Sequence, residues 1–249
     1  MPKGNASSIG LIGFGAFGKL IAAHLCRFFK VIVVDPAIST VDQCPDTVML
    51  GVPADMARCG IVIFAVPVSE LSAAISSVRT HLRTEATVVD VGSVKVVPAR
   101  VMLAELPPTV SIVGTHPLFG PQSARLGIRG RKIAVCPIRG RAIWRIAAFL
   151  RGALGLKVFI ATPEEHDREA AIVQGVTHLI AKVLVQMEPL PTRMTTASFD
   201  LLMQATEMVR YDAPGVFFAI ERRNPFAAEV RERFFALAAQ ARSELEPQQ

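Results

Sequence analysis

The sequence predicts an α/β fold followed by an all-helical part. Short apolar stretches alternate with helical or loop segments up to about residue 162, and no strand-like stretch follows that point. Strands that are apolar along their whole length are typical of a parallel sheet with helices on both faces. We therefore expect one domain over residues 1–162 and a helical domain over residues 163–249.

The strands of the first part can be located from their apolar, often β-branched residues. The first is "SIGLIG" (8–13), and a helix is expected over 17–29. A second helix is expected over 140–154, and further strands are predicted at 31–34, 60–67, 86–93, 110–117, 131–137 and 156–163.

The pattern changes at Glu164. "EEHDREAAIVQGVTHLIAKVLVQM" has apolar residues at a period near 3.6 for more than six turns, which predicts one long α-helix. The remainder also has helical character and is broken by Pro189, Pro191, Pro214 and Pro225.

The bulk composition excludes several classes of protein. Hydrophobic residues make up 51% of the 249 residues and charged residues 19%, as in a packed globular protein. The net charge is +6, but no run of Lys and Arg alternates with aromatic residues, so we expect a small anionic ligand and no nucleic acid. No unbroken apolar run reaches about 18 residues, so neither a signal peptide nor a membrane span is expected and the cytoplasm is favoured.

The four cysteines are Cys26, Cys44, Cys59 and Cys136. They form no CxxC pair and have no metal-ligand spacing. We therefore expect thiols in a reducing compartment, and no metal site.

A glycine-rich loop follows the first predicted strand. "GFGAFG" places Gly13, Gly15 and Gly18 in GxGxxG spacing between that strand and a helix, with Phe17 inside the loop. The three glycines permit a tight turn, close approach of a pyrophosphate and packing of the helix on the strand. Asp35 lies 20 residues after Gly15, where its carboxylate can accept hydrogen bonds from a ribose 2′-hydroxyl and would repel a 2′-phosphate. The sequence therefore predicts a Rossmann-type domain that binds NAD in preference to NADP.

One histidine lies where such a domain binds its substrate. His116 follows the strand "VSIVG", and ligands of parallel sheets bind at the carboxyl ends of the strands. Histidine can accept a proton near neutral pH, which the oxidation of a carbinol requires. His24 and His81 lie in a helix and in a surface-like segment, and we assign them no chemistry.

Three motifs carry a resemblance to a known family. "DVGSVK" (90–95), "GTHPLFGP" (114–121) and "EEHDREAAIVQGVTH" (164–178) resemble the prephenate/arogenate dehydrogenases of tyrosine biosynthesis, most nearly the plant-type branch. The resemblance implies an NAD-dependent oxidative decarboxylation of prephenate to 4-hydroxyphenylpyruvate, or of arogenate to tyrosine. It also implies that the helical part is a dimerisation domain and the enzyme a homodimer.

The same resemblance implies roles for individual residues. His116 and Ser93 would be catalytic: the imidazole would accept the proton of the ring hydroxyl, and Ser93 would hydrogen-bond near that hydroxyl. Thr115, Gln174 and His178 would bind substrate, the last two from one face of the long helix.

Several further residues are left with two readings. The ring carboxylate of the substrate needs a cation, for which Arg222 and Arg223 are the candidates. Lys95 is either functional or a solvated residue before the next helix, and His166 and Asp167 either match the motif functionally or cap their helix.

The choice between prephenate and arogenate depends on Cys136. The resemblance implies that arogenate-specific relatives carry an Asp 20 residues after the histidine, where this chain has Cys136. A thiol offers no anion to the arogenate ammonium, so prephenate is the favoured substrate and Cys136 a candidate substrate contact.

Two other functions remain as alternatives. A β-hydroxyacid dehydrogenase or imine reductase would use a lysine of the helical part, and Lys182 is the lysine in the long helix. A non-catalytic dinucleotide-binding regulator would need neither Ser93 nor His116, so their presence together argues against it.

Overall fold

The computed structural model describes residues 7–38 and 48–246, which form two compact units. Unit 1 is Met1–Glu164 and unit 2 is Glu165–Gln249. None of the described helices is long and apolar enough to cross a membrane. Cys44 lies outside the described residues, and Cys26, Cys59 and Cys136 form no disulfide.

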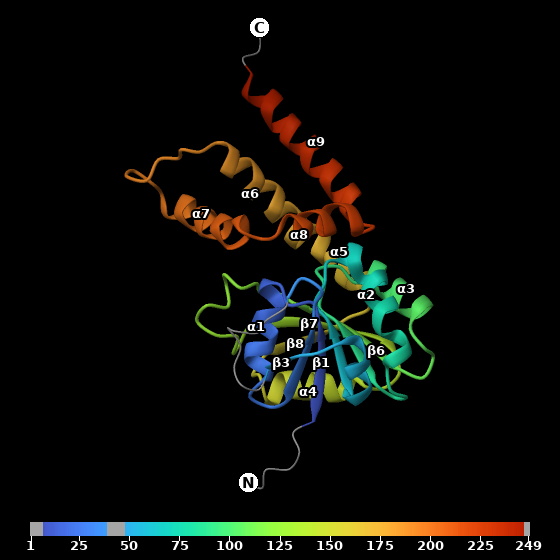
Figure 1. Cartoon of the computed structure of the whole chain (residues 1–249). Helices are drawn as coiled ribbons and strands as arrows, with labels where there is room; N and C mark the ends of the chain where they lie inside the picture. Colours follow the sequence, from blue (N-terminus) through green and yellow to red (C-terminus); the bar gives the residue numbers. More distant parts are fainter. Residues whose placement is uncertain (1–6, 39–47, 247–249) are drawn as a thin grey trace. The chain divides into compact units, whose positions relative to one another are not determined.

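Unit 1 is built on an eight-stranded sheet with the order β3-β2-β1-β4-β5-β6-β7-β8 (Figure 1). The strands are β1 (Ser8–Ile12), β2 (Lys30–Val34), β3 (Val48–Leu50), β4 (Ile61–Phe64), β5 (Thr87–Asp90), β6 (Ser111–Pro117), β7 (Lys132–Arg139) and β8 (Lys157–Ile160). β1 lies between β2 and β4, so the chain reverses its direction across the sheet at β1, which is where doubly wound sheets bind ligands.

The sheet departs from the sequence-based prediction at one pair of strands. β6 and β7 are antiparallel, whereas every other neighbouring pair is parallel. The predicted parallel sheet is therefore confirmed for the strands up to β6, and β7 is the strand that departs from it. An antiparallel pair needs no helical crossover, and a loop joins Pro117 to Lys132 with no helix between them.

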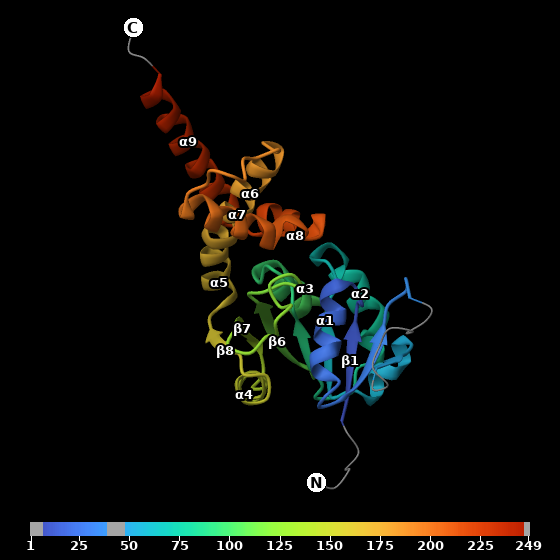
Figure 2. The same ribbon diagram turned by 90° about the vertical axis from the view of Figure 1, so that its left-hand side faces the viewer.

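Helices cover both faces of the sheet, as the unbroken apolar strands predict (Figure 2). On one face, α2 (Leu71–Val78) and α3 (Val96–Glu105) bury Leu71, Ile75 and Met102 against the sheet. On the other, α1 (Ala16–Leu25) and α4 (Ile143–Gly152) bury Leu25 and Ile143 in two neighbouring clusters. Short 3-10 turns are η1 (Pro53–Arg58), η2 (Val68–Glu70) and η3 (Arg79–His81).

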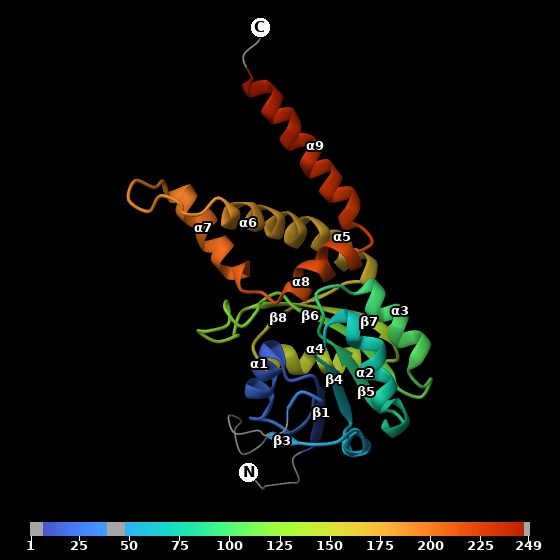
Figure 3. The same cartoon turned by 45° about the horizontal axis from the view of Figure 1, so that its top comes forward.

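Unit 2 contains only helices among its described residues (Figure 3). They are α6 (Thr177–Gln186), α7 (Ala197–Arg210), α8 (Pro214–Phe218) and α9 (Ala227–Leu245), with π-helical turns at η4 (Ala171–Val176) and η5 (Ala219–Arg223). α5 (Pro163–Ala170) spans the boundary between the units. α6 packs against α7, and both π turns pack against α9.

The π turn η4 corrects a second prediction. The segment from Glu164 was expected to be one uninterrupted α-helix, but it is α5, η4 and α6 in succession. A π turn widens the helix and changes the angular position of the residues that follow. Gln174 lies within η4 and His178 within α6, so the prediction that both side chains lie on one helical face stays a prediction.

Candidate active site

The glycine loop has the backbone that its sequence predicts. Gly13 directly follows β1 and has φ +94°, and a Cβ there would lie 2.6 Å from the Ala65 carbonyl oxygen. Gly18 is buried in α1, where a Cβ would lie 2.4 Å from the Gly13 carbonyl oxygen. At Gly15, the N-cap of α1, a Cβ would meet nothing within 4 Å. Two glycines thus let the loop and helix pack, and the third leaves open backbone at a helix N-terminus, which favours an anion.

Asp35, which follows β2, forms hydrogen bonds that link this loop to the end of the strand. One carboxylate oxygen accepts the backbone N–H of Phe14 at 2.7 Å, and the other accepts that of Ala37 at 2.9 Å. The residue is half-buried, so the carboxylate keeps a side open to solvent. A carboxylate has about four acceptor sites, so two remain for the hydroxyls of a ribose.

Phe17 lies elsewhere than the loop sequence suggests. Its side chain lines an apolar cavity between α1, α4 and the sheet. The residue is half-buried there, and its assignment as a cofactor contact stays a prediction.

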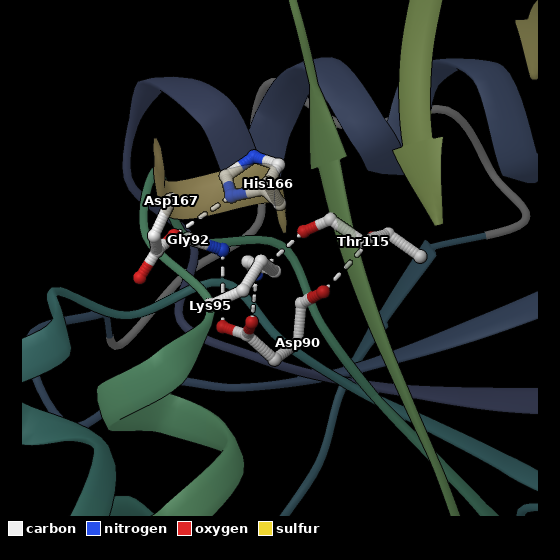
Figure 4. Close-up of polar contacts among 6 residues, drawn as sticks. All are labelled: Asp90, Gly92, Lys95, Thr115, His166 and Asp167. Atoms are coloured by element: carbon white, nitrogen blue, oxygen red, sulfur yellow. Dashed lines mark hydrogen bonds and ion pairs between the residues drawn. The ribbon is translucent and has the colours of Figure 1, made fainter. Parts of the chain in front are cut away.

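The carboxyl ends of β5 and β6 are joined by a buried polar network (Figure 4). Parallel pairing sets Asp90 beside Gly114 at these ends. The Lys95 ammonium forms an ion pair with the Asp90 carboxylate and donates to the Thr115 carbonyl at 2.7 Å. The Thr115 hydroxyl donates to the Asp90 carbonyl at 2.8 Å, and the other Asp90 carboxylate oxygen accepts the Gly92 N–H at 3.0 Å.

This network excludes the interpretation of Lys95 as a solvated residue. Lys95 has no exposed surface, and Asp90 and Thr115 are each 3% exposed. Sequence reasoning missed Asp90, although a carboxylate that ends an apolar strand five residues before a lysine was a usable signal. It also missed Gly114, where a Cβ would lie 3.2 Å from Cδ of Lys95.

The network lies beside the two residues expected to be catalytic. Ser93 belongs to the loop between Asp90 and Lys95, and His116 directly follows Thr115 in β6. His116 is 4% exposed and pairs across the ladder with Ala134. Because side chains alternate along a strand, His116 and Gly114 face the same side of the sheet.

Two predicted substrate contacts in unit 1 are deep in the fold. The Thr115 hydroxyl is engaged by the Asp90 carbonyl. Cys136 has no exposed surface and lies opposite Gly114 in β7. The positions of Thr115 and Cys136 indicate that these residues stabilise the sheet rather than contact a substrate.

In unit 2, the described structure buries three of the motif residues. The His166 and Asp167 side chains contact each other at 2.7 Å (Figure 4). Asn224 donates to the Asp167 carbonyl at 2.7 Å. His178 lies 3.8 Å from an Asp212 carboxylate oxygen, and its ring centroid is 6.3 Å from that of Phe217. Burial, and then the charge of Lys182, lower the pKa of His178, which favours the neutral imidazole.

The two candidate arginines are exposed at the surface of unit 2. Arg222 stacks its guanidinium 4.4 Å from the ring centroid of Phe218, and Arg223 ends η5 beside it. Lys182, the residue on which the hydroxyacid dehydrogenase alternative depends, lies 5.1 Å from the ring centroid of Phe217.

Comparison with known proteins points in the same direction as the motifs. Residues 54–138 match the family model of the prephenate dehydrogenase nucleotide-binding domain. Arogenate dehydrogenase 1 of Arabidopsis thaliana is 26% identical over 245 residues, which are 93% of this chain and 38% of that protein. Arogenate dehydrogenase 2 of the same plant is 28% identical, over 93% of this chain and 68% of that protein.

The fold is shared with solved structures of similar proteins. Prephenate dehydrogenase from A. aeolicus, solved with hydroxyphenyl propionate and NAD+, has a TM-score of 0.71 and 21% identity, covering 96% of this chain and 93% of that one. This chain spans well under half the length of the first Arabidopsis relative.

Proposed function

We propose that this chain is a member of the prephenate/arogenate dehydrogenase family and that it catalyses the NAD-dependent oxidative decarboxylation of prephenate or arogenate. One observation supports this most: the glycine loop and His116 lie at the carboxyl ends of parallel strands of one sheet. That edge is where such sheets bind dinucleotides and their substrates.

The residues of the loop fit NAD. Open space at Gly15 leaves room for a pyrophosphate on the first turn of α1, and the half-buried carboxylate of Asp35 can accept the ribose hydroxyls. Bound there, the nicotinamide would supply a hydride acceptor. The protein's own task is to orient the ring carbon that bears the hydroxyl and to manage one proton.

In this proposal His116 accepts the proton of the ring hydroxyl. Ser93 hydrogen-bonds near the same hydroxyl and orients it toward the imidazole. Loss of carbon dioxide then makes the ring aromatic, so the reaction is effectively irreversible. Lys95 and Asp90 hold the loop of Ser93 against the strand of His116 and do not themselves react. Gln174, His178, Arg222 and Arg223 stay as candidate substrate contacts of unit 2.

Of the two substrates we propose prephenate, and this preference depends on Cys136 alone. The complete burial of that thiol gives the choice little support, so both substrates must be assayed. The alternative is that the same reaction converts arogenate directly to tyrosine.

The homodimer is also part of the proposal. Unit 2 leaves large apolar side chains exposed on several helices, and a second copy of the chain could cover them. They include Val183 (52%), Met187 (60%), Leu201 (66%), Met208 (55%) and Leu237 (56%). A reducing compartment such as the cytoplasm suits the unpaired thiols of Cys26 and Cys59.

The deciding experiment is NADH formation by the purified chain with NAD and either prephenate or arogenate. We expect turnover with at least one of them and none with 3-hydroxyacids. Oxidation of a 3-hydroxyacid without turnover of either ring substrate would replace the proposal by the hydroxyacid dehydrogenase alternative.

A further inference from the structure

Unit 1 contains an apolar cavity that neither His116 nor Ser93 lines, although Phe17 and Thr115, two predicted ligand contacts, do. It has a volume of about 190 Å³ and lies between α1, α4 and the sheet. Ile63 and Val89 line it from the sheet, Leu20 from α1, and Ile146 and Phe149 from α4. A cavity of about 150 Å³ with such a lining stays dry and binds benzene. The cavity therefore has room for one aromatic ring.

A second hollow adjoins this cavity, and charged as well as apolar side chains line it. Its volume is about 340 Å³, and His24, Ile128 and Leu154 line both spaces. Arg27 and Arg129 also line the second hollow, and no acidic residue is among its described lining residues. Burial, and then the charge of Arg27, lower the pKa of His24, which favours its neutral imidazole.

An apolar chamber with a cationic mouth fits one kind of small molecule. The chamber removes a ring from water, and the two guanidinium groups attract an anion. From these features we infer that unit 1 binds a small aromatic carboxylate between α1 and α4, with the ring in the cavity and the carboxylate toward Arg27 and Arg129.

The mouth of this site is separate from the dinucleotide site of the proposed function, although Phe17 of the glycine loop lines the cavity. His24 follows Gly15 by nine residues along α1, which at 1.5 Å per residue is roughly 14 Å. The mouth thus lies at the end of α1 that is far from the glycine loop. The inference does not depend on the proposed reaction, although that reaction would form products of the same chemical class.

Calorimetric titration of the full chain can test the site with two matched probes. 3-Phenylpropionate carries a ring and a carboxylate, and 3-phenylpropanamide replaces the charge by a neutral group of similar shape. We expect the carboxylate to bind about tenfold more tightly, which is about 1.4 kcal/mol. The doubly substituted variant Arg27→Ser/Arg129→Ser should lose that preference and keep weak binding of the amide.

Control variants separate the site from general effects of charge and from the substrate site. Arg83→Ser/Arg100→Ser removes two exposed arginines of unit 1 that line neither hollow, and it should bind both probes as the parent does. Ile146→Phe fills the cavity and should weaken both probes at least tenfold. His116→Asn should leave unchanged the component of binding that the mouth variant removes, because His116 lines neither space.

Three outcomes would overturn the inference. They are no binding of either probe by the parent, equal affinity for the two probes, and binding that responds to His116→Asn while ignoring the mouth variant. If Ile146→Phe fails to fold, the two exposed mouth arginines still decide the question, since their removal leaves the core intact.

Discussion

The ammonium of Lys95 and the carboxylate of Asp90 form an ion pair in the interior of unit 1. Both groups have further partners, the Thr115 carbonyl for the ammonium and the Gly92 N–H for the carboxylate. A buried ion pair is retained at low cost only when such hydrogen bonds satisfy the remaining donors and acceptors. Here they also connect the strand that precedes Ser93 to the strand that carries His116.

Lys95→Met should strongly destabilise unit 1. It leaves the Asp90 carboxylate buried beside an apolar side chain, which costs about 3–5 kcal/mol. Trp144 is the single tryptophan of the chain and belongs to α4, so its fluorescence during urea unfolding reports on this unit. The double variant Asp90→Leu/Lys95→Met removes both charges and should recover most of the loss. A single variant as stable as the parent would mean that the pair contributes nothing.

His116→Asn tests the proposed proton acceptor. An amide occupies similar space, so the fold and NAD binding should persist while kcat falls by roughly 10²–10⁴, the usual contribution of a general base. The measurement is steady-state NADH formation with whichever ring substrate the parent uses. If kcat of the variant stays within about threefold of the parent value, the loss is far smaller than the loss of a general base would cause, and His116 is not the proton acceptor.

Asp35→Ser tests the coenzyme preference. The substitution removes the charge that would repel a 2′-phosphate, so the ratio of kcat/KM for NADP to that for NAD should rise by about tenfold or more. It also removes the acceptors of the Phe14 and Ala37 N–H groups, so some stability is expected to be lost as well. A parent that already prefers NADP would contradict the argument from Asp35.

The positions of most strands along the chain and the glycine turn could be predicted because their causes are local. β1 and β2 are apolar along almost their whole length, and Gly13 and Gly18 are required by contacts within a few residues or with a neighbouring strand. The three-residue strand β3 was missed because a stretch of that length carries no periodicity.

The errors arise where distant parts of the chain decide the structure. An apolar stretch reads the same in either direction, so "RKIAVCP" could not reveal that β7 runs antiparallel to β6. Helical periodicity does not distinguish a π turn from the α-helix around it, and so η4 was missed. The position of Phe17 at the cavity and the partners of Lys95 depend on tertiary packing that no motif encodes.

The glycines of the loop allow a prediction that separates folding from binding. Gly18→Ala places a Cβ 2.4 Å from the Gly13 carbonyl oxygen, so α1 must shift from β1 at a cost of about 1–3 kcal/mol. That cost exceeds the gain of about 1 kcal/mol from replacing a helical glycine by alanine.

Gly15→Ala should behave in the opposite way. Its Cβ meets nothing within 4 Å and its φ is −64°, so stability should change by no more than about 0.5 kcal/mol. NAD affinity should nevertheless fall about tenfold or more, because the new methyl group occupies the space that a pyrophosphate needs. Gly152→Ala, in equally open space at the end of α4, is the matched control: it should leave NAD affinity unchanged and raise stability by up to about 1 kcal/mol. Urea unfolding followed by Trp144 fluorescence and NAD titration of the three variants give both quantities. If Gly15→Ala binds NAD as tightly as the parent, the pyrophosphate does not lie on this turn, and the assignment of the dinucleotide site to the loop is wrong.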